Sequence, residues 1–203
     1  MSGPLGLDVS RETLDDLEAY AALLRKWNAR INLVSKSTID DLWTRHILDS
    51  LQLYDLARHP VRHWVDMGSG GGFPGIVIAL LAKHIGSPTK VTLVESDIRK
   101  CAFLRTVIRE TGAPAVVLSR RVEELEPLEA DVLSARALAD LSTLLRYSEM
   151  HLAPSGQAIF PKGETWKKEL EAAERTWKFK LHVDKSKTED GPVILSIAGV
   201  ARV

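Results

Sequence analysis

The pattern of apolar and polar residues divides the chain into two parts with different periodicity. Residues 8–28 repeat apolar side chains every three or four positions, which predicts an amphipathic helix, with Ser10 in place to cap it. Residues 38–56 have the same spacing and predict a second helix. Both segments precede the first strand-like segment, so we expect residues 1–60 to form an N-terminal helical cap on the main domain.

From residue 61 onward, short apolar strands alternate with helices, which is typical of a parallel sheet with right-handed crossovers. Strands are predicted at residues 61–67, 90–94, 115–118, 131–135 and 157–160, and helices at 74–85, 98–111, 123–126, 138–152 and 164–177. Two further strands, 180–183 and 193–200, are joined by a segment too short for a crossover helix. We therefore expect residues 61–203 to form an α/β domain with a seven-stranded, mostly parallel sheet that closes with an antiparallel hairpin.

The segment V-D-M-G-S-G-G-G-F-P-G-I, residues 65–76, reads as strand, tight turn and helix. Glycines allow positive φ and a close approach of the backbone to a ligand, and the helix that follows presents free N–H groups. Asp66, two residues before Gly68, makes the turn D-x-G-x-G-x-G, which resembles the cofactor turn of class I S-adenosylmethionine-dependent methyltransferases, where the acid lies near the amino-acid end of the cofactor.

Two other interpretations of this turn remain open. The pattern G-x-G-x-x-G of dinucleotide-binding turns is also present, at Gly70, Gly72 and Gly75. A glycine cluster after a strand can also be a structural turn that binds nothing. The predicted hairpin at the end of the sheet favours a methyltransferase over a dinucleotide-dependent dehydrogenase.

Residues at the ends of the second and third strands are placed to contact a nucleoside. Glu95 ends the second strand, where an acid in a doubly wound fold accepts hydrogen bonds from ribose hydroxyls. Val122 and Glu123 follow the third strand and are expected to border the adenine base. The competing interpretations are a surface acid at a strand end and an ordinary helix start with acidic residues.

Arg136 closes the fourth strand in the segment S-A-R-A-L, where the transferred methyl group would lie. Relatives that methylate amines resemble one another in carrying Asn or Asp with two prolines and an aromatic residue at this place. An arginine stays protonated and cannot act as a base, but it forks two hydrogen bonds to a carboxylate, a phosphate or a guanine O6/N7 edge. Cys101 is expected in the core, and His46 is more typical of a packing or junction residue than of a catalyst.

The composition of the chain limits which partners and which cellular location we expect. The chain has 203 residues, 45% hydrophobic and 27% charged, with 27 basic and 27 acidic residues. Zero net charge leaves nucleic-acid binding to local patches, for which two basic clusters are candidates: Arg25, Lys26, Arg30 and Lys36, and Lys162, Lys167 and Lys168. The start of the chain lacks the pattern of a signal peptide, and no apolar run is long enough to span a membrane, so we expect a cytoplasmic protein without membrane contact.

Taken as a whole, the chain resembles one family, the bacterial small-subunit ribosomal RNA guanine N7-methyltransferases, called RsmG or glucose-inhibited division protein B. The resemblance rests on six motifs: W-N-A-R-I-N-L-V-S (27–35), R-H-I-L-D-S-L (45–51), D-M-G-S-G-G-G-F-P-G-I (66–76), R-R-V-E-E-L (120–125), S-A-R-A-L (134–138) and P-K-G (161–163). It implies a class I, Rossmann-like methyltransferase fold for the predicted sheet.

The resemblance also implies the chemistry. The methyl donor would be S-adenosylmethionine, and the acceptor N7 of guanine 527 in 16S ribosomal RNA, as naked RNA or in the small ribosomal subunit. Carried over by motif, with Glu95 added from its position, the expected cofactor contacts are Gly68, Phe73, Glu95, Val122, Glu123 and Arg136. Arg136 is also the expected catalytic residue. We expect a monomer without a metal site.

Two departures from the family pattern lie in the turn, where residues 69–72 are richer in glycine and Phe73 replaces a common leucine. Two functions outside the methyltransferases also use such glycines: a nicotinamide-dependent oxidoreductase, and a nucleotide-binding assembly factor without turnover. Comparing the binding of S-adenosylhomocysteine with that of NAD distinguishes the oxidoreductase from a methyltransferase. An activity assay distinguishes the assembly factor from an enzyme.

Overall fold

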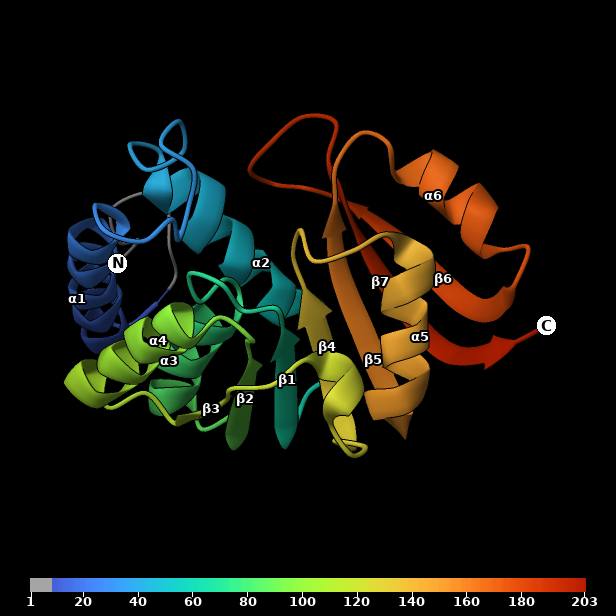
Figure 1. Ribbon diagram of the computed structural model, residues 1–203, viewed down its shortest axis with the longest axis horizontal. Coiled ribbons are helices and arrows are strands. Elements are labelled where there is room, and N and C mark those ends of the chain that lie inside the picture. Colours follow the sequence, from blue (N-terminus) through green and yellow to red (C-terminus); the bar gives the residue numbers. More distant parts are fainter. Residues whose placement is uncertain (1–8) are drawn as a thin grey trace.

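The computed structural model describes residues 9–203 and shows one seven-stranded sheet with helices on both faces (Figure 1). The predicted helix start at residue 8 and the chain start on which the signal-peptide argument rests lie outside the described residues. The strands are β1 (His63–Met67), β2 (Lys90–Val94), β3 (Ala115–Leu118), β4 (Ala130–Ala135), β5 (Leu152–Lys162), β6 (Trp177–Lys185) and β7 (Val193–Arg202).

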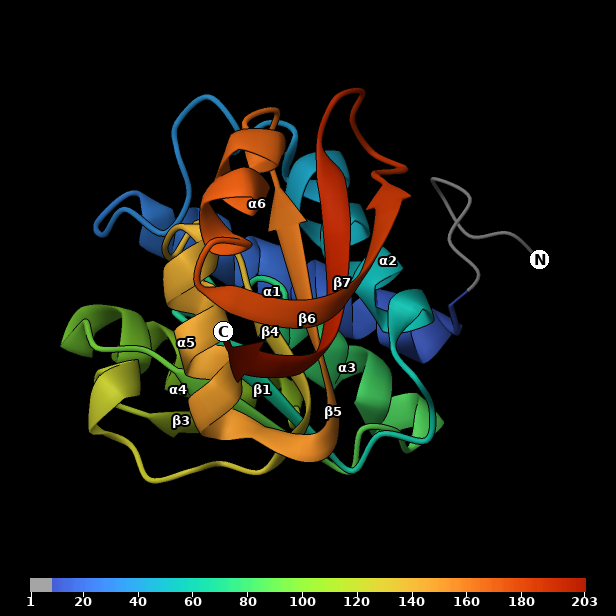
Figure 2. The same ribbon diagram turned by 90° about the vertical axis from the view of Figure 1, so that its right-hand side faces the viewer.

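The strand order is β3-β2-β1-β4-β5-β7-β6. β1 to β5 pair in parallel, whereas β7 is antiparallel to both β5 and β6. The predicted mostly parallel sheet with a closing antiparallel hairpin is therefore confirmed. β7 is inserted between β5 and β6, so β6 forms the edge, as Figure 2 shows from that side.

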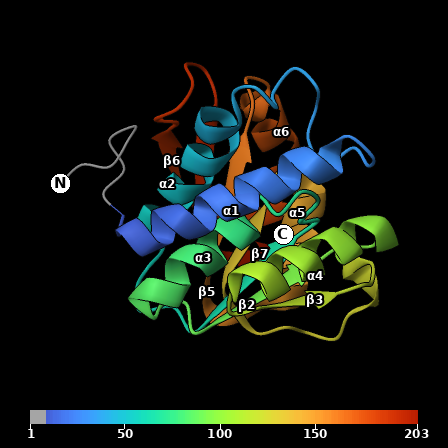
Figure 3. The ribbon, with the colours of Figure 1, turned by 90° about the vertical axis from the view of Figure 1, so that its left-hand side faces the viewer.

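Two hydrophobic clusters lie on opposite faces of the sheet. On one face α1 (Arg11–Asn28) lies across α3 (Gly75–Ile85) and α4 (Ile98–Thr111), and α2 (Asp49–Leu56) packs against α3 (Figure 3). On the other face α5 (Leu141–His151) and α6 (Trp166–Ala173) cover β4, β5 and β7. Residues of α1, α2 and α3 share one hydrophobic core. The division into a cap of residues 1–60 and a domain of residues 61–203 stays a prediction. No helix within residues 9–203 is long and apolar enough to cross a membrane.

The predicted helix over residues 38–56 begins only at residue 42, and its first part is a π-helix. Residues 38–41 form turns, and a π-helix, η2 (Trp43–Leu48), precedes α2. The hydroxyl of Thr38 lies 2.9 Å from that of Ser35, and the Thr38 N–H donates to the Ser35 carbonyl. Such local bonds compete with helix formation, so the helical spacing of apolar residues was not sufficient to start a helix there.

Other element boundaries also differ from the predicted ones. α5 begins at Leu141 rather than 138, because Ala137 has φ of 52° and Asp140 caps the helix by accepting from the Thr143 N–H. The predicted cap of α1 by Ser10 is confirmed, although that helix begins at Arg11. The predicted helix 123–126 is a 3₁₀ turn, η3 (Val122–Glu124), α6 is shorter than predicted, and β5 and β6 are longer.

Candidate active site

The glycine turn between β1 and α3 needs residues without a side chain. Gly68, Gly70 and Gly72 have φ of 65°, 54° and 98°, values that L side chains rarely adopt. A Cβ on Gly68 would lie 2.6 Å from Cδ1 of Leu138, so this glycine also makes room for the segment after β4. The turn brings the backbone to the carboxyl edge of the sheet, where ligands of open α/β sheets bind.

Asp66 supports the turn from beneath. Its side chain is fully buried, Oδ2 accepts from the Gly75 N–H at 3.2 Å, and Oδ1 accepts from the Ser134 hydroxyl at 2.8 Å. Ser134 in turn accepts from the indole N–H of Trp64 at 2.9 Å. Burial raises the pKa of Asp66 to about 6. Asp66 lines neither of the two pockets described next, so it acts on the shape of the turn.

A pocket of about 330 Å³ opens at the carboxyl ends of β1, β2 and β3. Four of the six predicted cofactor residues line it, namely Gly68, Glu95, Val122 and Glu123. Its remaining walls include Gly70, Lys100, Arg120, Arg121, Ala137, Leu138 and Tyr147. We call this cavity the nucleoside pocket.

Glu95 is fixed at the edge of the nucleoside pocket by two backbone groups. Oε2 accepts from the Gly70 N–H at 2.9 Å and Oε1 from the Asp97 N–H at 2.8 Å. The side chain is only 8% exposed, yet each carboxylate oxygen can accept a further bond. The carboxylate is therefore held in place to receive hydroxyl donors from a sugar.

Val122 and Glu123 form the opposite wall, in the 3₁₀ turn after β3. The Val122 side chain is buried, and its carbonyl lies 3.1 Å from Nε2 of the buried His151. Glu123 is exposed, and hydrogen bonds from its own N–H and from the Tyr147 hydroxyl lower its pKa. The sequence interpretation did not include His151 or Tyr147, because contacts from a helix distant in sequence leave no local pattern.

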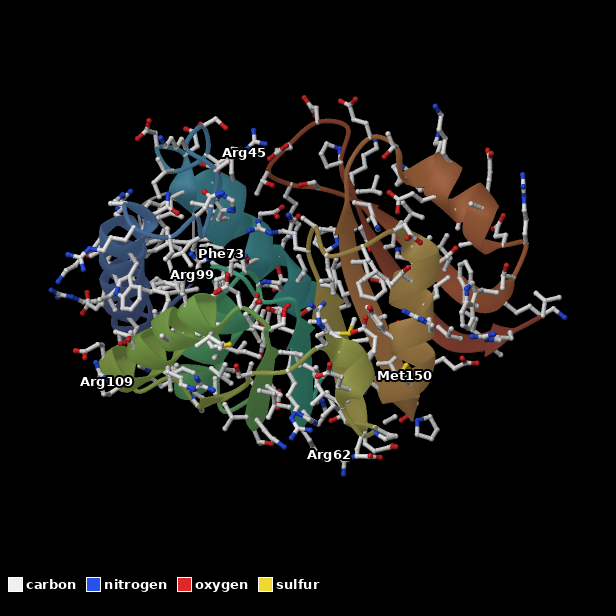
Figure 4. All side chains as sticks on the ribbon, in the orientation of Figure 1. Arg45, Arg62, Phe73, Arg99, Arg109 and Met150 are labelled. Carbon is white, nitrogen blue, oxygen red and sulfur yellow. The ribbon has the colours of Figure 1, made fainter. Side chains whose placement is uncertain are left out.

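Arg136 lies at the meeting point of three motifs. Nη2 donates to Nδ1 of His46 at 2.7 Å, and Nη1 lies 3.2 Å from the Arg45 carbonyl and 3.4 Å from Oδ2 of Asp49. Its guanidinium carbon is 5.1 Å from the centre of the Phe73 ring, on which the His46 ring stacks at 5.0 Å. Figure 4 shows Phe73 well inside the molecule and Arg45 nearer its upper rim. The π-helix, the glycine turn and β4 thus position one guanidinium together.

His46 is a neutral acceptor in this arrangement. An arginine only donates, so Nδ1 carries the lone pair and the proton lies on Nε2, 2.9 Å from the hydroxyl of Thr38. Burial, and to a smaller extent Arg136 and Arg45, lower the pKa of His46 to about 4. The expectation of a junction residue fits this position, with a polar partner on each ring nitrogen.

Phe73 does not line the nucleoside pocket. It is 4% exposed and packs against Tyr20, with ring centres 5.3 Å apart. Tyr20, which sequence reasoning missed, donates its hydroxyl to the Gly71 carbonyl and so ties α1 to the turn. The predicted cofactor contact of Phe73 stays a prediction, and its observed contacts position Arg136 and His46.

A second pocket of about 460 Å³ lies beside the first, at the carboxyl ends of β4 and β5. We call it the acceptor pocket. Arg136 lines it, and Ala137 and Leu138 line both pockets, so this short segment is a shared wall. The loop between β6 and β7, residues 186–192, contributes Ser186, Glu189 and Pro192. A ligand in one pocket would therefore lie next to a ligand in the other, at the end of β4.

The helices that carry parts of the two predicted basic clusters lie far apart, and one lysine of the second cluster is already paired. Lys162 lies 2.7 Å from Glu169 and 3.0 Å from the Ala139 carbonyl, with its side chain 9% exposed. It therefore supports the acceptor pocket and is not free to grip phosphate. α1, which ends with Arg25 and Lys26, and α6 lie at opposite ends of the long axis in Figure 1. Cys101 is buried, and its thiol donates to the Glu95 carbonyl at 3.2 Å, as expected of a core residue.

Comparison with solved structures establishes the fold class. TYW2 of M. jannaschii, solved in complex with AdoMet, is 17% identical with a TM-score of 0.59, covering 86% of this chain and 80% of its own. A SAM-dependent methyltransferase from Aquifex aeolicus is 12% identical with a TM-score of 0.60, covering 88% and 98%. The sheet is that of the class I methyltransferases, as the resemblance implied.

Comparison with curated proteins gives the family. A protein of Ruegeria sp. (strain TM1040), named ribosomal RNA small subunit methyltransferase G, is 55% identical and covers 99% of this chain and 98% of its own. A protein of the same name from Rhodospirillum centenum is 51% identical over 95% of this chain and 87% of its own. Residues 13–191 match the GidB family. The chain belongs to the GidB family, rRNA small subunit methyltransferase G.

Proposed function

We propose that this protein transfers a methyl group from S-adenosylmethionine to N7 of guanine 527 in 16S ribosomal RNA. The observation that carries the proposal is the pair of pockets that share Ala137 and Leu138 at the end of β4. One pocket suits a nucleoside and the other has room for a purine base, since binding sites of this kind span roughly 300 to 1,000 Å³. Membership of the GidB family supports the RNA substrate.

The residues of the nucleoside pocket fit the donor. S-adenosylmethionine supplies an activated methyl group on a positively charged sulfonium. Glu95 is placed to accept the ribose hydroxyls, because its carboxylate is already oriented by the Gly70 and Asp97 N–H groups. Val122 offers an apolar wall for the adenine and Glu123 an acceptor for its amino group, while the positive φ of Gly68 lets the ligand approach the backbone.

Arg136 is the residue proposed to act on the reacting groups. Its guanidinium lines the acceptor pocket and adjoins the shared wall, so it can donate hydrogen bonds to guanine O6 or to the donor's carboxylate and leave the N7 lone pair free to attack the methyl group. His46, Asp49, the Arg45 carbonyl and Phe73 fix its orientation. The same contacts explain why the R-H-I-L-D-S-L motif belongs to the site.

The proposed reaction needs no general base. Guanine N7 already has an in-plane lone pair and no proton to lose, so the protein has only to align acceptor and donor. His46 is the histidine placed beside Arg136, and it stays neutral with both nitrogens engaged. Catalysis then rests on positioning by Arg136 and by the two pockets.

The expected setting is the cytoplasm, with a monomeric protein acting on 16S RNA or on the small subunit. The antiparallel β7 and the family match both argue against the nicotinamide-dependent oxidoreductase that the glycine turn alone allowed. Titration with S-adenosylhomocysteine and with NAD, followed by calorimetry, tests the choice. We expect saturable binding of S-adenosylhomocysteine alone, and binding of NAD alone would overturn the proposal.

A further inference from the structure

We propose that Glu189, on the loop between β6 and β7, recognises the Watson–Crick edge of the acceptor guanine and so excludes adenine. This inference rests on the proposed function, since it assumes that a purine enters the acceptor pocket with N7 toward the shared wall. Glu189 lines that pocket from the loop of residues 186–192, whereas Ala137 and Leu138 line it from the side of the nucleoside pocket.

The geometry of a purine connects the two walls. N7 lies on the five-membered ring, and N1 and the 2-amino group of guanine lie on the far side of the six-membered ring. When N7 faces Ala137 and Leu138, the N1 and N2 donors face away from the shared wall. Figures 1 and 2 both place the β6–β7 loop at the rim of the molecule, beyond the carboxyl ends of β4 and β5.

Among the residues that the structure describes, Glu189 is the carboxylate of this pocket with the fewest polar contacts. Asp49 already accepts from the Gln52 amide at 2.8 Å and the Thr188 hydroxyl at 3.0 Å. Glu169 accepts from Lys162 at 2.7 Å and from the Leu141 N–H at 2.9 Å. Within residues 9–203, the polar contact recorded for Glu189 is an ion pair with Arg45 at 3.1 Å, and its side chain is 32% exposed.

The loop that carries Glu189 is held in place by α2. The amide oxygen of Gln52 accepts from the Lys187 N–H at 2.9 Å, and Asp49 accepts from the Thr188 hydroxyl. Arg45 then orients the carboxylate itself. Glu189 is therefore a preorganised acceptor rather than a side chain on a free loop.

A carboxylate in this position distinguishes the purines by chemistry. Guanine offers two neighbouring donors, N1–H and the 2-amino group, to the two carboxylate oxygens. Adenine has a lone pair at N1, which a carboxylate repels. The ion pair with Arg45 engages Oε1 of Glu189 and leaves the other lone pairs of the carboxylate available.

The test compares guanine with inosine, which lacks only the 2-amino group, at the acceptor position of reconstituted small subunits. For the wild-type protein we expect kcat/KM to be about tenfold or more higher for guanine, the range of a charge-assisted hydrogen bond. Glu189→Ala should lower kcat/KM for guanine by a similar factor and bring the guanine-to-inosine ratio to within about twofold of one.

Two matched variants separate recognition from support of the loop. Asp190→Ala, an exposed neighbour that does not line the pocket, should leave kcat/KM and the ratio unchanged. Arg45→Ala removes the ion pair that orients the carboxylate but keeps the carboxylate itself, so the guanine-to-inosine ratio should fall less than it does in Glu189→Ala. The inference would be overturned if Glu189→Ala kept the wild-type guanine-to-inosine ratio of kcat/KM. It would also be overturned if Arg45→Ala lost this ratio as completely as Glu189→Ala does. A wild-type protein that methylates neither subunit would overturn the proposed function as well.

Discussion

Nη2 of Arg136 donates to Nδ1 of His46 at 2.7 Å, which joins the end of β4 to the π-helix before α2. Because the guanidinium is always charged, the bond requires a neutral imidazole and fixes its tautomer. The histidine thus serves as an orienting acceptor for the arginine. Through this contact the N-terminal segment helps to position the residue that we propose to act in methyl transfer.

Arg136→Lys is expected to lower the rate of methyl transfer roughly 10- to 100-fold while changing the free energy of unfolding by about 1 kcal/mol or less. Lysine keeps the charge near Asp49 but has one nitrogen in place of Nη1 and Nη2, which contact the Arg45 carbonyl and His46 separately. Single-turnover assays and urea unfolding measure the two effects. A fully active lysine variant would show that only the positive charge of Arg136 is needed, and not its paired hydrogen bonds.

The single-turnover rate at saturating donor and RNA is expected to be nearly flat between about pH 6.5 and 8.5. The pKa of His46 is lowered to about 4, so its charge does not change in this range, and guanine N7 has no proton to release. A rate that rises tenfold per pH unit, and loses that rise in His46→Gln, would reveal a general base and contradict the N7 assignment.

Glu95→Ala should weaken binding of S-adenosylhomocysteine about tenfold or more, the range of one charge-assisted hydrogen bond. The side chain also accepts from Gly70, so part of the loss reflects a looser turn. Glu124→Ala is the control, because Glu124 is exposed nearby without lining the pocket. If calorimetry gave equal affinities of the two variants for S-adenosylhomocysteine, Glu95 would not be a contact of the methyl donor.

Asp66→Asn is expected to change how stability depends on pH. Burial raises the pKa of this carboxyl from 3.8 in the unfolded chain to about 6, so the folded state favours the protonated form. Its contribution to stability is present below pH 4 and is lost as pH rises through 6. The wild type should therefore lose stability relative to Asp66→Asn between pH 4 and 7, by at most on the order of 3 kcal/mol. The free energy of unfolding is measured with urea at each pH for both proteins. An equal dependence on pH in the wild type and in Asp66→Asn would contradict the raised pKa of Asp66.

The sheet was predictable because its strands and crossovers carry a strong local pattern, and the glycine turn with Glu95 has a fixed place in such a sheet. The surroundings of Arg136 were not predictable. His46 and Phe73 reach it through packing between segments far apart in the chain, and Ser35 and Thr38 replace the first turns of the expected helix with hydroxyl contacts. Asp66, expected near the ligand, lies beneath the turn because its oxygens satisfy buried donors.

The most direct test of the account is the position of the methyl group on the RNA. Small subunits from cells lacking the gene are incubated with the purified protein and labelled S-adenosylmethionine, and the 16S RNA is digested and mapped by mass spectrometry. The account predicts one added methyl group, on N7 of guanine 527, and an initial rate of incorporation roughly 10- to 100-fold lower with Arg136→Lys. A methyl group on another atom or nucleotide, or an equal initial rate with the variant, would contradict it.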